Sequence, residues 1–201
     1  MSKLILPSPV ILASESFDVD TSGIGPAGAT ANGVATLSPL RFLVPAYATT
    51  KDSSIDIELS ITSAALAGNY TLTPQLVFTD PDGVTNGTNY VFTQTLTVDP
   101  TNAQIINFNI KVFFAKGAAT APAEYRPVLH YRGTTCSVDS TSTATVDTGS
   151  YNTSNSPAMT RMDYPRALTV QLIRAGAGTS RMNVRFVRAV GYNLNMDNWT
   201  V

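Results

Sequence analysis

Residues 55–62 alternate strictly between apolar and polar side chains, in the order Ile-Asp-Ile-Glu-Leu-Ser-Ile-Thr. Successive side chains of a β-strand point to opposite faces, so this pattern predicts a strand with one buried and one solvated face. Residues 70–79, 90–98 and 105–114 repeat the pattern and are rich in β-branched and aromatic residues. The middle of the chain is therefore predicted to form an antiparallel sheet.

Further strand-like segments precede and follow this block, at residues 34–47, 125–132, 167–173 and 183–192. A Gly-rich segment joins the last two, which predicts a closing hairpin. No segment has the periodicity of a convincing helix. The pattern predicts an all-β fold, an antiparallel, jelly-roll-like β-sandwich of about eight to ten strands, whose strand order periodicity does not reveal.

The chain of 201 residues fits one domain, predicted to span residues 15–201 behind an extended N-terminal arm at residues 1–14. The single cysteine, Cys136, excludes an intramolecular disulfide framework. Only 13% of residues are charged, so little repulsion keeps copies of the chain apart. This composition is typical of a well-packed β-protein or of an assembly subunit.

Charge is divided unevenly along the chain. Residues 1–125 have a net charge of −5, whereas residues 126–201 have eight arginines and a net charge of +4. The two parts are electrostatically complementary. They can pair within one subunit or steer one subunit onto its neighbour.

The arm contains an apolar sequence interrupted by Pro7 and Pro9, with the apolar residues Leu4, Ile5, Leu6, Val10, Ile11 and Leu12. Those prolines and the missing cleavage site argue against a signal peptide, and no segment is long and apolar enough to predict a membrane span. Proline favours extended backbone. Two structures remain open: an edge strand on the chain's own domain, which is favoured, and an arm that docks on another subunit.

No group of residues predicts a catalytic, metal or cofactor site. The sequence Asp80-Pro81-Asp82-Gly83 favours a tight turn, because the later bidentate Glu of a calcium loop is absent. The only histidine, His130, lacks a nucleophile motif around it, which favours a structural role. We therefore expect no enzyme activity and no cofactor.

Two regions are candidates for binding. In the C-terminal region, arginines cluster on the predicted hairpin and a lone tryptophan follows it: Arg181, Arg185, Arg188 and Trp199. Arginine suits anion recognition, but the isoelectric point of 5.7 argues against nucleic acid, so salt bridges or subunit contacts are expected. A polar loop offers a possible ligand surface at Tyr151, Asn152 and Asn155.

Taken together, the apolar arm, the Gly- and Ala-rich segment 21–33 and the Thr- and Asn-rich strands resemble the capsid decoration (cement) proteins of tailed-phage virions. The resemblance covers the whole chain and rests on no diagnostic motif. It implies a virion protein assembled in the host cytoplasm, a homo-oligomer such as a trimer, which contacts the major capsid protein or other virion subunits and stabilises the shell. The alternative is a carbohydrate- or receptor-binding jelly-roll module of a phage head or tail.

Overall fold

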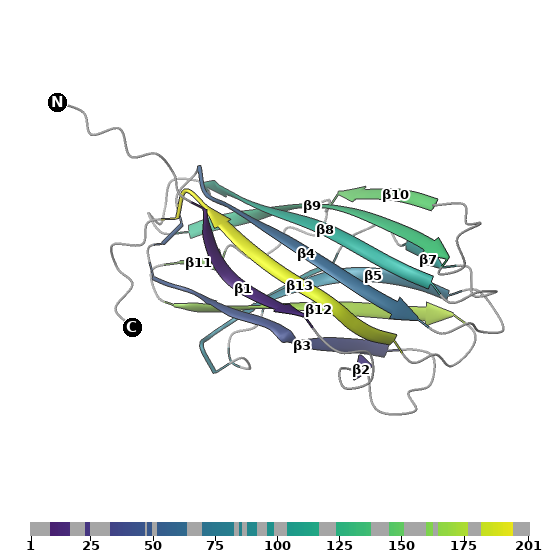
Figure 1. Ribbon diagram of the computed structural model, residues 1–201. Helices are drawn as coiled ribbons and strands as arrows, with labels where there is room; N and C mark the ends of the chain where they lie inside the picture. Colours follow the sequence, from purple (N-terminus) through teal and green to yellow (C-terminus); the bar gives the residue numbers. More distant parts are fainter. Residues whose placement is uncertain are drawn as a thin grey trace.

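The computed structural model describes thirteen strands and several turns. The described residues are 9–16, 23–24, 33–46, 48–49, 52–63, 70–82, 85, 88–91, 96–98, 104–116, 124–137, 145–150, 160–162, 165–176 and 182–194. They form thirteen strands in two sheets, and all strand pairs are antiparallel (Figure 1). The predicted all-β antiparallel sandwich is confirmed, with thirteen strands in the described residues where about eight to ten were expected. No membrane-spanning helix occurs in the part of the chain described.

The larger sheet has eight strands. Its main path, in spatial order, consists of β1 (Val10–Ser16), β13 (Met182–Tyr192), β4 (Ser54–Ser63), β8 (Gln104–Lys116), β9 (Glu124–Ser137) and β10 (Thr145–Ser150). Two short strands extend its margins: β2 (Gly23–Ile24) pairs with β13, and β11 (Thr160–Arg161) pairs with β9. The first and last long strands of the chain thus lie side by side (Figure 1).

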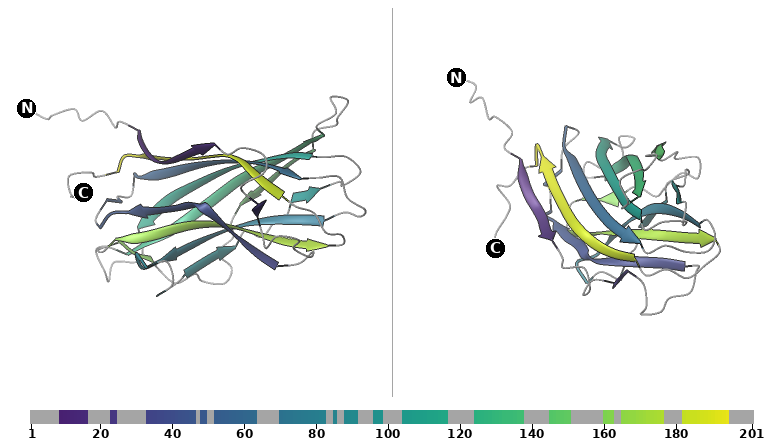
Figure 2. Two further views of the ribbon diagram at one scale, coloured as in Figure 1. Left: turned by 60° about the horizontal axis from the view of Figure 1, so that its bottom comes forward. Right: turned by 45° about the vertical axis from the view of Figure 1, so that its right-hand side comes forward.

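The smaller sheet has five strands and lies against one face of the larger one (Figure 2). Its main path consists of β3 (Gly33–Val44), β12 (Arg166–Gly176), β5 (Tyr70–Thr79) and β6 (Thr88–Val91). The short strand β7 (Leu96–Val98) also pairs with β5.

The alternating side chains explain how the two sheets share a core. Ile55, Ile57, Leu59 and Ile61 of β4 are all buried, whereas Glu58 between them is exposed. From the smaller sheet, β5 and β12 contribute further buried apolar side chains: Leu72, Leu76, Phe78, Leu168, Val170 and Leu172. Burial of such side chains contributes about 1.5 to 3 kcal/mol each, which makes this core the main stabilising element of the fold.

Two predictions about strand pairing are wrong. All four segments of the central block contain strands, with β6 and β7 in place of one strand at residues 90–98. They do not form one sheet: β4 and β8 pair in the larger sheet, whereas β5, β6 and β7 belong to the smaller one. The predicted closing hairpin is also absent, because β12 pairs with β3 and β5 while β13 pairs with β1 and β4. Both strands carry apolar side chains for the same core, and they supply them from opposite sheets.

Candidate interaction surface

The outer faces of the two sheets differ in exposure. In the smaller sheet, every residue from Leu72 to Thr79 is buried, so both faces of β5 lie away from solvent. On the larger sheet, the side chains that point away from the core are partly or largely exposed along the middle strands β13, β4 and β8. The outer face of the larger sheet is therefore the candidate interaction surface.

Strand register arranges this surface in rows that run across the strands. One row places Arg188, Glu58 and Asn109 opposite one another on β13, β4 and β8, and all three are exposed. The next row contains Asp56 and Lys111, whose carboxylate and ammonium groups are 3.1 Å apart. The surface thus mixes charges of both signs with amide groups.

The β1–β13 pair brings together two of the predicted interface regions. Ile11 lies opposite Val190, and Ser14 lies opposite Arg188. The Ile11 side chain is 60% exposed, whereas Leu12 packs against the core. Residues 10–16 form β1 at the edge of the larger sheet, and residues 10–14 belong to the predicted arm. Val10 is half-buried in the same strand, and Leu4, Ile5 and Leu6 lie outside the described residues.

The predicted arginine cluster is only partly described. Arg185 lies at an irregularity in the β13–β4 register, and its Nε donates a hydrogen bond to Thr62 Oγ1 at 3.3 Å. Arg188 is exposed, three residues further along β13. Arg174 belongs to β12 of the other sheet, so it is not a cross-strand neighbour of these two arginines. Arg181 and Trp199 lie outside the described residues.

Two exposed aromatic residues occur on the same surface and were not singled out from the sequence. Ser54 of β4 lies opposite Phe113 of β8 on one side and opposite Tyr192 of β13 on the other. The Phe113 side chain is 45% exposed and the Tyr192 side chain 37% exposed. For Phe113 a sequence signal existed, because strict alternation along β8 places it on the face opposite to Val112 and Phe114.

The ends of β4 and β13 near this aromatic row are held together by polar contacts. Ser53 Oγ donates to the Asn193 carbonyl at 2.7 Å, and Asn193 Nδ2 donates to the Asp52 carbonyl at 2.9 Å. Leu194 then folds back over Gly191, where an added Cβ would be 2.2 Å from Leu194 Cδ1. The backbone on both sides of Tyr192 is therefore tightly constrained.

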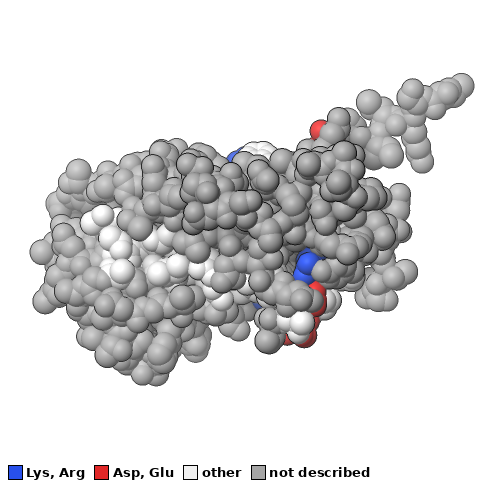
Figure 3. Space-filling view, turned by 180° about the vertical axis from the view of Figure 1, so that it is seen from behind, with Lys and Arg blue, Asp and Glu red and all other residues white. Residues whose placement is uncertain are grey.

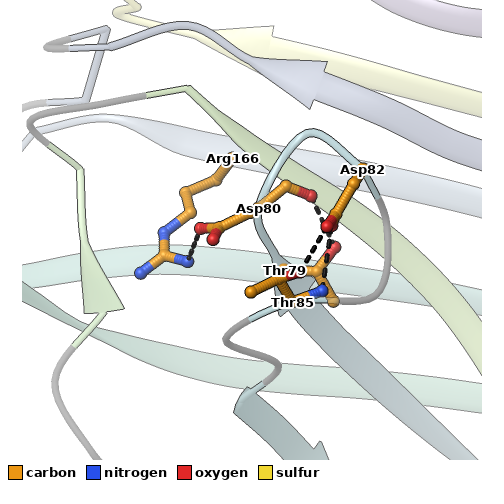
Figure 4. Close-up of polar contacts among 5 residues, drawn as sticks. All are labelled: Thr79, Asp80, Asp82, Thr85 and Arg166. Atoms are coloured by element: carbon orange, nitrogen blue, oxygen red, sulfur yellow. Dashed lines mark hydrogen bonds and ion pairs between the residues drawn. The ribbon is translucent and has the colours of Figure 1, made fainter.

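The predicted turn after β5 forms a second polar cluster, at the margin of the smaller sheet (Figure 4). The Thr85 amide and hydroxyl both donate to the Asp82 carboxylate, and the Asp80 amide donates to the Thr85 carbonyl. Arg166, whose side chain is only 6% exposed, forms an ion pair with Asp80 at 2.9 Å. Seen from behind, basic and acidic side chains adjoin on this side of the molecule (Figure 3).

The contacts among Asp80, Asp82, Thr85 and Arg166 hold this turn in place, and we call the cluster the clamp. Arg41 Nη2 donates to the Pro81 carbonyl, so arginines from β3 and β12 both hold the turn that follows β5. Across the described ranges, no three of His, Cys, Asp and Glu gather as a metal site requires. Asp80 and Asp82 contact Thr85 and Arg166, while Gly83 of the predicted Asp-Pro-Asp-Gly turn lies outside the described residues.

The remaining candidate residues have little or no described structure. The backbone of His130 pairs with Lys111 on β8 and with Ser150 on β10. Tyr151, Asn152 and Asn155 lie outside the described residues, so the possible ligand loop stays a prediction.

The fold and this surface define a β-sandwich protein whose larger sheet has a solvated outer face. No family model and no curated protein matches the chain. Among solved structures, a lectin UEA-II complexed with galactose is similar over 92% of this chain and 94% of that chain, at 10% identity and a TM-score of 0.40. A chain of infectious bursal disease virus, Gt strain, is similar over 94% of this chain and 42% of that chain, at 13% identity and a TM-score of 0.19. Structural similarities with such low identities and TM-scores assign no family and no ligand to the chain.

Proposed function

We propose that this chain is a non-catalytic subunit of a virion, of the capsid decoration or cement type, which stabilises a phage shell by contacts with neighbouring subunits. Its partners are the major capsid protein or other virion subunits, and further copies of the chain, with which it forms a homo-oligomer such as a trimer. Assembly takes place in the host cytoplasm, and no cofactor takes part.

The observation that carries the proposal is the pairing of β1 with β13. It joins the apolar N-terminal segment to the arginine-bearing C-terminal strand, although these regions are far apart in sequence. Ile11 and Arg188 are both exposed there, one apolar and one cationic. Interfaces between proteins combine apolar anchors with arginine in this way, because arginine stacks and hydrogen-bonds as well as carrying charge.

The low charge of the chain supports the same proposal. A stable interface buries about 800 Å² on each partner, and charged residues are depleted at its core. A protein in which only 13% of residues are charged can form such contacts with little desolvation of charge. A cement subunit needs no more than this, since added interface free energy by itself stabilises the shell.

The experiment combines two measurements on the full chain. Sedimentation velocity over a wide concentration range measures self-association, and electron microscopy of virions from the virus that carries this gene locates added protein on the shell. We expect bound density on the shell, with Ile11→Asp and Arg188→Glu reducing occupancy. The matched control is Leu43→Asp, which alters an exposed apolar residue of the smaller sheet. A protein that stays monomeric and leaves every shell bare would overturn the proposal.

A further inference from the structure

We propose that the aromatic row of Phe113, Ser54 and Tyr192 is a binding platform for a linear, uncharged, β-linked glycan. This function goes beyond the proposed assembly role and does not depend on it. The two use different residues of the outer face: the β1–β13 edge at Ile11 and Arg188 for assembly, and this row at the end of β4 for the glycan.

The geometry of the row fits stacked sugar rings. Phe113 and Tyr192 are both direct neighbours of Ser54, on the two strands that flank β4 (Figure 1). Directly opposed residues of antiparallel strands have Cα atoms about 5 Å apart, so the Cα atoms of the two aromatic residues are about 10 Å apart. Alternate pyranose rings of an extended β-1,4-linked chain are spaced on the same scale, so one chain can stack on both residues while the intervening ring passes over Ser54.

Polar side chains next to the row supply hydrogen-bonding groups for sugar hydroxyls. Lys111, two residues from Phe113 on β8, is 52% exposed and offers donors besides its contact with Asp56. Asn109 and Glu58 follow in the next row, and both are exposed. Aromatic stacking surfaces beside donors and acceptors of fixed position are what a polyhydroxylated ring requires for recognition.

The platform is held in place before any ligand binds. Two hydrogen bonds connect Asn193 to the start of β4, and Leu194 covers Gly191, so the residues on both sides of Tyr192 are fixed. Phe113 lies within the thirteen-residue strand β8, between two paired neighbours. A rigid platform loses little conformational entropy on binding, which favours affinity for a ligand with few contacts.

The same residues disfavour other ligands. Nucleic acid requires a basic surface along its phosphate backbone, whereas Lys111 forms an ion pair with Asp56 and Arg188 lies opposite Glu58 on this face. A protein partner requires a contiguous apolar centre that excludes water, whereas Ser54 separates the two aromatic residues of this row. An uncharged glycan is the occupant compatible with both features.

The test is a titration of the full-length protein with neutral hexasaccharides of β-1,4-linked glucose, mannose and N-acetylglucosamine, followed by calorimetry and by backbone NMR. We expect one of them to bind and to shift the amides of residues 54, 113 and 192. Phe113→Ala and Tyr192→Ala should each weaken binding about tenfold or more, as for other stacked rings. Phe113→Tyr and Tyr192→Phe should retain it, and Leu43→Ala, in the smaller sheet, should leave it unchanged.

Thermal unfolding followed by circular dichroism controls for loss of fold in each variant. The proposal is overturned if none of the hexasaccharides binds, or if binding persists undiminished in the double variant Phe113→Ala/Tyr192→Ala. It is also overturned if these substitutions abolish self-association and leave glycan binding intact, because the row would then be a contact between copies. Loss of shell binding in Ile11→Asp with intact glycan binding separates this site from the assembly surface.

Discussion

Phe78 of β5 and Phe114 of β8 meet edge to face across the two sheets, with ring centroids 6.4 Å apart and ring planes at 84°. Both side chains are almost completely buried, at 0% and 1% exposure. This arrangement places the positive edge of one ring against the negative face of the other. The pair therefore joins the two sheets directly.

Replacement of either ring should destabilise the sandwich strongly. We expect Phe78→Ala and Phe114→Ala each to lower the free energy of unfolding by about 3 to 5 kcal/mol, because each leaves a cavity in a close-packed core. The double variant should lose less than the sum, by about 0.5 to 1.5 kcal/mol, owing to the ring contact. Urea denaturation measures all three variants, and strict additivity would show that the rings do not interact.

A second prediction contrasts a buried ion pair with an exposed one. Asp80→Asn removes a carboxylate whose Oδ1 is 2.9 Å from the buried guanidinium of Arg166, so we expect a loss of about 3 kcal/mol in unfolding free energy. Lys111→Ala removes the partner of Asp56 in a pair that is half exposed, and should cost less than about 1 kcal/mol. Equal losses for the two variants, measured by urea denaturation, would contradict the structural importance of the clamp.

The sequence predicted the fold class because alternation reports which side chains face a core. Ile55, Ile57 and Leu59 are buried as expected, and so are Phe108 and Ile110 of β8. Alternation does not report which sheet a strand joins. The sequences of β12 and β13 would suit a hairpin equally well. They do not form one, because β12 pairs with β5 at ten residues and β13 pairs with β4 at ten residues.

The candidate surface was harder to predict, for a physical reason. Exposure of Phe113 depends on whether any other element covers the outer face of its sheet, which is a property of the whole fold. In β5 the same kind of pattern leads to burial on both faces: Thr73, Gln75 and Val77 are buried although they alternate with core residues. The adjacency of Ile11 and Arg188 likewise depends on β1 pairing with β13.

Gly191 provides a test of the contact that fixes the end of β13. Its replacement by Ala would place a Cβ 2.2 Å from Leu194 Cδ1 and 3.0 Å from Leu194 Cγ. Leu194 must move, and we expect Gly191→Ala to reduce the free energy of unfolding by about 1 to 3 kcal/mol. Gly191→Ala should cost less in a Leu194→Ala background, because the obstructing side chain is gone. Thermal and urea unfolding of the four proteins of this cycle measure the effect, and an unchanged cost in the Leu194→Ala background would disprove the contact.

Replacement of Asn193 by glycine should reduce the stability of the protein less than replacement by alanine. Its φ of 53° is in the left-handed region, where a residue with a Cβ other than Asn or Asp is destabilised by about 1 to 2 kcal/mol. Its side chain also donates to the Asp52 carbonyl, a bond that contributes about 1 kcal/mol. Asn193→Ala loses both contributions, whereas Asn193→Gly loses the hydrogen bond and gains backbone freedom suited to this φ. We therefore expect Asn193→Ala to be the less stable variant by more than about 1 kcal/mol in urea denaturation. Equal stability of the two variants would mean that residue 193 does not adopt the left-handed conformation in solution.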